Sequence, residues 1–473
     1  MLFTCSCFFC QCRYVAFRAF SNPVTDKICS SALLEDVKEL YEKISIAHPD
    51  IYRHVDQKTL DSLYVELVNV CSEDQTLLSF VGSVSGFLQA LKDSHTFVSL
   101  RELLPYQSLK RHYLPMRLME QEGNIYVVKS FKNRLPSGVQ LLKVNGFSVD
   151  SLLRLAPEFT PKESLADSAF ASFQAHVVSA LINLNNSHNR NVYQWYDGKD
   201  SLQQPLKSPR FSKIHRHDFF HGEAVDIRYT REGNVAILKI GSFSPKNLKR
   251  FRKQLDEVFQ DILDKPTEKL VLDLRFNSGG FIVLQEYLMS FLVPENTVYT
   301  STYVYKRSPY DRFAQLSKLE RRRFIKTAER FYPRGAISRE LDFYRKPMGS
   351  LDTVRNSPVL KNRMAKSFLG PCNLLVNDGS MSASANFTAW FMEKHRGEVF
   401  GSAVSGTNAG TFANPHTFFL PNTGLPISVS TMKVNLDSGA EKELPLIPNH
   451  VVIPTPKELQ LEIDSVMNFA INH

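Results

Sequence analysis

One stretch of the sequence places small hydroxyl residues between a predicted strand and a predicted helix. The apolar run 373–377 is typical of a buried strand, and the helical pattern beyond it carries aromatic residues from Phe387 onward. Between them lie residues 379–386, Gly-Ser-Met-Ser-Ala-Ser-Ala-Asn, with Ser382 in their middle. A serine in such a turn can expose its Oγ, and the N–H groups at a helix N-terminus can stabilise an oxyanion. The same pattern is also typical of an ordinary helix N-cap.

Two other segments carry residues suited to the same chemistry. The apolar strand 269–274 leads into Gly279 and Gly280, and paired glycines at a strand end let the backbone approach a ligand and direct N–H groups at it. An ordinary turn before a helix explains these glycines equally well. His95 follows Ser94 where a predicted helix gives way to a strand-like run. A neutral imidazole can accept a proton near pH 7, although a histidine at such a junction is more often simply exposed.

The composition is that of a globular protein with more than one domain. The chain has 473 residues, of which 43% are hydrophobic and 22% charged, and this excludes an intrinsically disordered protein. The formal net charge is +9, but the basic residues are spread along the chain, with one denser block at 321–323, and no nucleic-acid-binding module is evident. The charge therefore predicts a general attraction to acidic partners or surfaces, with no nucleic acid as partner.

Residues 1–30 are predicted to be a leader or a disordered segment, because no core pattern starts before Ser31. Their cysteines (Cys5, Cys7, Cys10 and Cys12) stand among apolar residues without a later Cys/His pair at zinc-site spacing, so we expect neither a metal site nor a disulfide framework. The leader lacks an initial positive charge and is weak; it favours the cell envelope, the periplasm or secretion, with the cytoplasm left open. Nothing beyond it is long and apolar enough to span a bilayer, so membrane association is expected only through this leader.

The region before residue 223 is predicted to hold three units. Apolar periodicity predicts three amphipathic helices, which would form a bundle over residues 31–100. Residues 113–160 are β-rich, with a hairpin signal at Asn145-Gly146. Residues 161–222 are a connecting region whose role the sequence does not indicate.

From residue 223 to residue 473, strands alternate with helices. This order predicts a largely parallel sheet flanked by helices. A basic helical insert at 300–350 interrupts the alternation. Its charge predicts a surface position, with a lid over the site as one role for it.

Several of these segments match known motifs in a consistent order. Residues 273–280, Asp-Leu-Arg-Phe-Asn-Ser-Gly-Gly, are similar to DLRxNxGG, and the serine stretch is similar to T-x-S-A-x-E. The segments 48–52 and 93–96 are similar to a helical N-terminal module, and 420–422 to a late strand motif. Together they resemble the C-terminal-processing, or tail-specific, serine peptidase family, in particular its tricorn-core-like branch. The resemblance covers roughly residues 32–456.

The resemblance implies an α/β fold with a crotonase-like peptidase core, an N-terminal helical bundle and an inserted PDZ-like module. The part of the chain that resembles the module is 138–153, where the glycine signature is degenerate. Such a module would bind the carboxyl end of an unfolded chain through an edge strand and backbone N–H groups.

For the catalytic residues, the resemblance makes Ser382 the nucleophile and His95 the general base, the latter within a Ser94-His95 pair. That branch of the family also supplies a glutamate late in the chain, which fixes the tautomer of the histidine. Glu443 is the first choice for this glutamate and Glu441 the second.

The resemblance also implies an oxyanion hole, formed by the N–H of Ala383 and an N–H of Gly279 or Gly280. Three positions depart from the family pattern, and one of them is Asn449, where the family has an aspartate after the proline. The lysine used by the tail-specific branch would fall at Thr407, which cannot take a proton from a serine. The glutamate that ends the family's serine motif is Ala385 here.

The sequence therefore predicts a serine endopeptidase that cleaves flexible polypeptides or protein C-terminal tails and needs no cofactor. One alternative is a non-catalytic binding protein on the same fold, and a covalent probe for Ser382 would discriminate between the two. A crotonase-like acyl-CoA enzyme is less favoured, because no patch for the CoA phosphates is evident near the glycines. The protein substrate, the cleavage preference, the oligomeric state and the mature N-terminus cannot be deduced from the sequence.

Overall fold

The computed structural model describes residues 26–99, 112, 114–161, 167–185, 188–209, 227–309, 316–328, 341–362, 364, 366–437 and 443–473. The cysteine-rich leader and Glu441 lie outside these ranges. Among the described residues, no helix has the length and apolar character needed to cross a membrane.

The described chain begins with three helices, in the places where apolar periodicity predicts them. These are α1 (Ser30–Ala47), α2 (Gln57–Val70) and α3 (Leu77–Gln89). α1 stops before His48-Pro49 because the residue before a proline disfavours the helical conformation. Asp56 and Thr76 cap α2 and α3 by accepting hydrogen bonds from backbone N–H groups of the first turn. The short strands β1 (Lys27–Ile28) and β2 (Gln75–Thr76) pair beside them.

A second unit contains an antiparallel sheet with the strand order β4-β5-β6-β8-β9, in which β7 pairs with β6. Its strands are β4 (Met116–Gln121), β5 (Asn124–Ser130), β6 (Gln140–Val144), β7 (Phe147–Ser148), β8 (Arg190–Tyr196) and β9 (Ser201–Lys207). Its helices are α5 (Val149–Leu155) and α6 (Asp167–Asn185). Two short 3-10 helices, η1 (Phe131–Asn133) and η2 (Ala156–Glu158), complete it. We call residues 114–209 the inserted module. The sequence-based boundary at residue 160 is too early, because β8 pairs with β6 and belongs to the same sheet.

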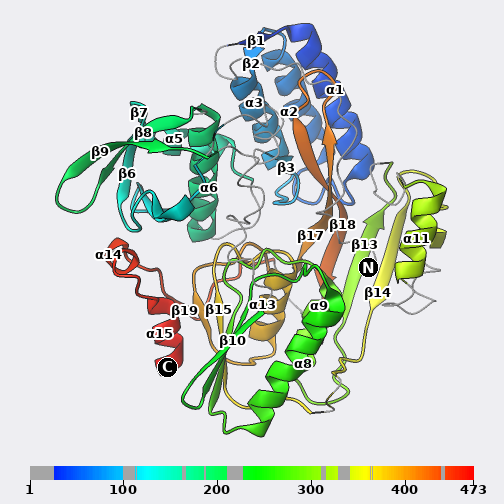
Figure 1. The fold of residues 1–473 in the computed structure, drawn as a ribbon. Coiled ribbons are helices and arrows are strands. Elements are labelled where there is room, and N and C mark those ends of the chain that lie inside the picture. Colours follow the sequence, from blue (N-terminus) through cyan, green and yellow to red (C-terminus); the bar gives the residue numbers. More distant parts are fainter. Residues whose placement is uncertain are drawn as a thin grey trace.

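The core of the chain is a six-stranded sheet with the order β10-β11-β12-β15-β16-β19 (Figure 1). The strands are β10 (Ile227–Glu232), β11 (Val235–Ile240), β12 (Lys269–Asp273), β15 (Cys372–Val376), β16 (Val399–Gly401) and β19 (His450–Val451). All neighbouring pairs except β10 with β11 are parallel, so the prediction of a largely parallel sheet is confirmed.

Helices cover both faces of this sheet. The helices α8 (Leu248–Asp264), α9 (Ile282–Met289) and α13 (Ala383–Glu393) share a core with alternate strand residues such as Leu272 and Leu374. The intervening residues, such as Val271, pack with α15 (Ser465–Asn472) on the other face. The sequence predicts one closing helix at 457–469, but the structure has α14 (Pro456–Gln460) and then α15, which begins after the N-cap Asp464.

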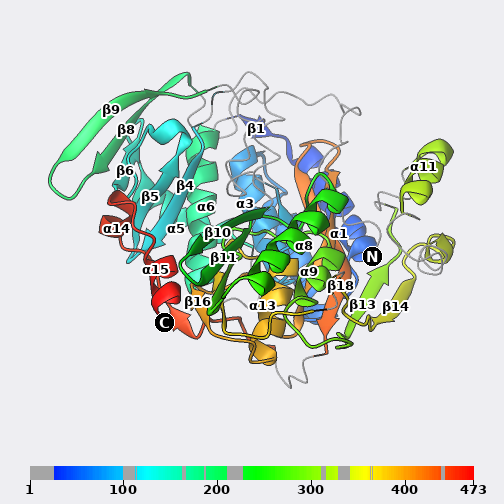
Figure 2. The same ribbon diagram turned by 60° about the horizontal axis from the view of Figure 1, so that its bottom comes forward.

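The basic insert is built differently from the prediction. It begins with β13 (Ser301–Lys306) and ends with β14 (Leu351–Asn356), which pair in a sheet of order β14-β13-β18-β17. The long strands β17 (Gly410–Phe419) and β18 (Pro426–Leu436) form a hairpin, and the short β3 (Phe97–Val98) pairs with β18. The basic helix α11 (Lys318–Ala328) lies at the outer end of the β13–β14 pair (Figure 2).

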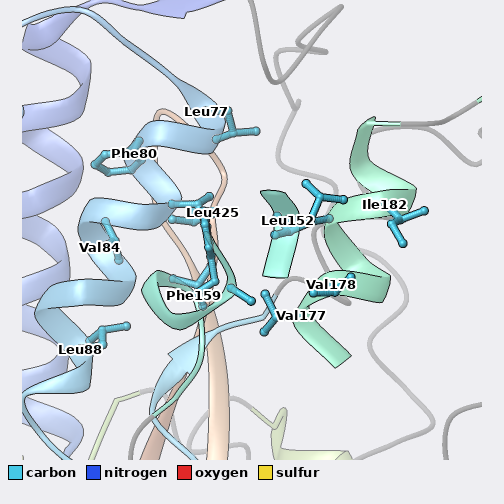
Figure 3. Close-up of a cluster of buried hydrophobic side chains, with 14 of the residues drawn as sticks. Leu77, Phe80, Val84, Leu88, Leu152, Phe159, Val177, Val178, Ile182 and Leu425 are labelled. Atoms are coloured by element: carbon cyan, nitrogen blue, oxygen red, sulfur yellow. The ribbon is translucent and has the colours of Figure 1, made fainter. Parts of the chain in front are cut away.

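One hydrophobic core joins the N-terminal helices, the inserted module and the tip of the β17–β18 hairpin. In Figure 3, Phe80 and Leu88 of α3 lie at the left of the cluster, Phe159 and Leu425 lie in its middle, and Val178 of α6 lies at its right. Because these units share a core, the segment that carries His95 is held between α3 and the hairpin.

Candidate active site

Ser382 occupies a strained turn between β15 and α13. Its backbone has φ 52° and ψ −118°, a conformation that costs a non-glycine residue on the order of 1–3 kcal/mol. Hydrogen bonds to the neighbouring strand end hold the turn: Ser380 Oγ donates to the carbonyl of Leu274, and the N–H of Met381 donates to the carbonyl of Asn277. Although Ser382 is the N-cap residue of α13, its side chain makes no capping hydrogen bond. The Oγ is therefore not used by the helix and is available for chemistry.

The glycine pair lies directly against this turn. A Cβ added to Gly279, whose φ is +91°, would be 2.7 Å from Ser382 Cβ and 2.9 Å from Ala383 N. The N–H of Gly279 donates to Asn277 Oδ1 at 3.0 Å. The N–H groups of Gly280 and Ala383 have no hydrogen-bond partner among the described residues. Of the two glycines, Gly280 therefore offers the available donor, while Gly279 provides the close approach to the serine.

His95 lies on the segment that connects α3 to β3. Its carbonyl accepts a hydrogen bond from Ser428 Oγ of β18 at 3.0 Å. Its ring Nδ1 is 3.5 Å from Ser94 Oγ and 3.9 Å from Asp93 Oδ1. Burial lowers the pKa of His95, and the charge of Asp93 opposes that shift. Because its pKa lies below the ordinary value of 6.5, the His95 ring is neutral near pH 7 and can accept a proton there.

The His95 segment and the helix that follows Ser382 both adjoin the β17–β18 hairpin, because α13 packs against β17 and β3 pairs with β18. No hydrogen bond joins the His95 ring to Ser382 Oγ among the described residues. In sites without substrate, this catalytic hydrogen bond is often long.

Among the described residues, no hydrogen bond or ion pair joins Glu443 to the His95 ring. Glu443 Oε2 accepts a hydrogen bond from Arg53 at 2.6 Å, and Glu443 Oε1 accepts one from Thr407 at 3.2 Å. The Thr407 hydroxyl, at the position where the resemblance would place a lysine, also lies 2.7 Å from the Gly410 carbonyl. Glu441 lies outside the described residues.

One residue of the site was not singled out from the sequence. Asp93 is fully buried, and its carboxylate contacts both the backbone and the ring side of His95. Its place two residues before His95 is a signal that could have identified it, because an aspartate often hydrogen-bonds the backbone N–H two residues further on.

The inserted module contacts both loops of the site. The Arg117 guanidinium of β4 lies 3.9 Å from the centre of the Phe276 ring, and Phe276 has φ +64° in the glycine loop. His176 of α6 pairs with Asp378, four residues before Ser382, at 3.4 Å. Within the described ranges, no group of three or more histidine, cysteine, aspartate or glutamate residues could hold a metal ion.

Comparison with known proteins agrees with this geometry. Residues 234–452 match the family model "Peptidase family S41". The crystal structure of mature CPAF is similar with a TM-score of 0.60 at 14% identity, over 93% of this chain and 96% of that chain. Mature CPAF complexed with lactacystin gives a TM-score of 0.61 at 13% identity, over 94% and 97%. At these identities the two structures show a shared fold, and no curated protein matches the sequence. Over residues 234–452 the chain is therefore similar to peptidase family S41, and this match supports a serine peptidase.

Proposed function

We propose that this peptidase cleaves flexible polypeptides or protein C-terminal tails, with Ser382 as nucleophile and His95 as general base. The observation that carries the proposal is the strained backbone of Ser382, whose Oγ is left out of the helix cap while Gly279 lies against its backbone. Strain of this kind persists where the surrounding structure enforces it, and it is concentrated at catalytic sites.

The chemistry follows from the positions of these groups. His95 Nε2 takes the proton of Ser382 Oγ while Oγ attacks the carbonyl carbon of the scissile bond. The N–H groups of Gly280 and Ala383 stabilise the oxyanion that develops. His95 then gives the proton to the leaving amine, and water, activated by the same ring, hydrolyses the acyl-enzyme.

A flexible substrate fits this site because the catalytic groups come from separate units. His95 belongs to the N-terminal part, Ser382 and Gly280 belong to the S41 domain, and the inserted module contacts the Phe276 and Asp378 loops. An extended chain can reach between such units, whereas a folded one is hindered. The late-chain glutamate that orients His95 is Glu443 or Glu441: Glu443 is bound to Arg53 and Thr407, and Glu441 lies outside the described residues.

The test uses a fluorophosphonate probe together with an unstructured peptide substrate. We expect the probe to label wild-type protein at Ser382 and the peptide to be cleaved internally or near its carboxyl end. Ser382→Ala should abolish both, while Ser380→Ala serves as a control because that hydroxyl is bound to the Leu274 carbonyl. A wild-type protein that is neither labelled nor active would instead support the non-catalytic binding protein.

A further inference from the structure

The net charge of the chain is concentrated in the basic insert. Residues 300–350 contain 13 basic and 5 acidic residues, a net charge of +8, whereas the rest of the chain contains 44 basic and 43 acidic residues. Basic residues occur throughout the sequence, but only in the insert are acidic residues scarce. The attraction to acidic partners that the composition predicts therefore comes almost entirely from this insert.

Some of the basic side chains of the insert are already used within the fold. Lys306 and Arg307 donate hydrogen bonds to backbone carbonyls, and Arg307 is buried. Arg345 and Lys346 form ion pairs with nearby aspartates at 2.8 Å each. The surface charge of the described part of the insert therefore belongs mainly to α11.

The helix α11 carries a row of exposed basic side chains. Five of its 11 residues are basic and one is acidic, Glu320, which accepts the N–H and the hydroxyl of Ser317 at the helix start. Lys318, Arg322 and Lys326 are exposed and follow one another at intervals of four, so they lie along one face of the helix. None of the three forms an ion pair with a described residue. We call these three residues the basic row.

An ordinary solvated helix of this chain has a different charge pattern. The helix α8 contains four basic and four acidic residues, and its exposed Lys253 pairs with Glu257 at 3.4 Å. In α11, by contrast, the basic row places like charges four residues apart, which disfavours a helix. The row is therefore unfavourable in the free protein, and an anionic partner would remove the repulsion.

The spacing of the basic row fits an extended polypeptide. Four residues of an α-helix rise by about 6 Å. Side chains on one face of an extended chain are two residues, or about 6.6–6.8 Å, apart. Acidic side chains at alternate positions of such a chain can therefore each meet one member of the row.

The position of α11 separates this surface from the catalytic residues. α11 lies beyond the edge strand β14, on the side of that sheet away from α13, in both views of the fold (Figures 1 and 2). A segment bound there is not the segment that is cleaved. A flexible polypeptide can still present another of its segments to Ser382.

We propose that the basic row of α11 is a docking site for acidic, extended segments of the polypeptide substrate, remote from the bond that is cleaved. That the docked chain is a substrate rests on the proposed function. Docking makes the encounter of the cleaved segment with Ser382 intramolecular and so raises its effective concentration. An acidic segment should therefore lower KM and leave kcat unchanged.

The first experiment measures binding without cleavage. Inactive Ser382→Ala protein is titrated into a fluorescent peptide of alternating Glu and Ser at low ionic strength, and anisotropy gives Kd. Two triple variants are made in this background. The α11 variant is Lys318→Gln, Arg322→Gln and Lys326→Gln, and the α8 control is Lys249→Gln, Arg250→Gln and Lys253→Gln.

Both variants remove three exposed positive charges, and glutamine keeps the helix propensity of lysine and arginine. We expect Kd to rise about 10-fold in the α11 variant and less than about 2-fold in the α8 control, because each exposed ion pair contributes little alone. Added salt should bring the parent protein close to the α11 variant, because it screens exposed charges.

The second experiment measures cleavage by otherwise wild-type protein. One cleavable core is joined through a flexible linker, at either end, to a tail of alternating Glu and Ser or of alternating Gln and Ser. We expect KM to be about 10-fold lower with the acidic tail at equal kcat. The α11 variant should cleave both peptides with the KM of the Gln-tailed one and with unchanged kcat.

The outcomes separate this proposal from the proposed function. Equal Kd in the α11 variant and the α8 control would overturn the docking site, even if the peptides are cleaved. A second result would also overturn it: peptide binding that the α11 variant leaves unchanged, together with lost binding to vesicles of phosphatidylcholine and phosphatidylserine, would make a membrane surface the partner. If the protein cleaves neither peptide but loses acidic-peptide binding in the α11 variant, the docking site is supported and the proposed function fails.

Discussion

Replacing Gly279 by alanine places a methyl group where the structure has no room for one. The new Cβ would be 2.7 Å from Ser382 Cβ, 2.8 Å from the Met381 carbonyl oxygen and 2.9 Å from Ala383 N. Two of these three atoms belong to the backbone, so relief requires the turn itself to move. The φ of +91° adds a conformational cost of about 1–2 kcal/mol for a residue with a Cβ.

Both effects can be separated with Gly146→Ala as the matched control. Gly146 has a similar φ of +85°, but a Cβ there would have no atom within 4 Å. Gly146→Ala should therefore lose only the conformational cost, whereas Gly279→Ala should lose about 1–3 kcal/mol more through overpacking. Chemical denaturation of the two variants measures the difference.

The same displacement should reduce catalysis. Because the Gly279 position touches both Ser382 and the Ala383 N atom, the shift misplaces nucleophile and oxyanion donor together, and we expect kcat to fall about 100-fold to 1,000-fold, as when one oxyanion donor is removed. Gly146→Ala should keep wild-type kcat. The assay is peptide cleavage together with the rate of fluorophosphonate labelling. Equal kcat and equal stability in the two variants would refute the close approach of Gly279 to the serine turn.

Three other outcomes are expected. Ser382→Gly should abolish labelling and raise the free energy of unfolding by about 1 kcal/mol, because relief of about 1–3 kcal/mol of strain exceeds the added chain entropy of glycine; unchanged or lower stability in denaturation would contradict this. Asp36→Ala should cost about 1–3 kcal/mol, since the buried Asp36 accepts the Thr423 N–H and hydroxyl at the hairpin tip, whereas Glu39→Ala on the same helix should change stability little. Because burial lowers the pKa of His95, the acid limb of the wild-type kcat/KM profile should lie below pH 6.5. An acid limb above pH 6.5 would contradict a lowered pKa of His95.

The parallel core could be predicted from the sequence because its signals are local. Strands buried on both faces are continuous apolar runs, and β11 and β12 begin where such runs begin. β14 could not be found in this way: its side chains alternate between exposed and half-buried, and it is a strand only because it pairs with β13. The strand β8 was missed although its side chains alternate between buried and more exposed positions, a pattern typical of a strand. What its sequence could not indicate is its partner β6, which lies some fifty residues earlier.

The same distinction applies within the active site. The partner of Glu443 is Arg53, which lies 390 positions earlier, so no spacing in the sequence could indicate that the two meet. The contact between Asp93 and His95 spans two residues and is a turn in which an aspartate oxygen accepts the N–H two positions on, with Thr96 bonded to the same side chain. Such a turn depends on local sequence, so the hydrogen bond between Asp93 and the His95 backbone could be predicted, whereas the contact between Glu443 and Arg53 could not.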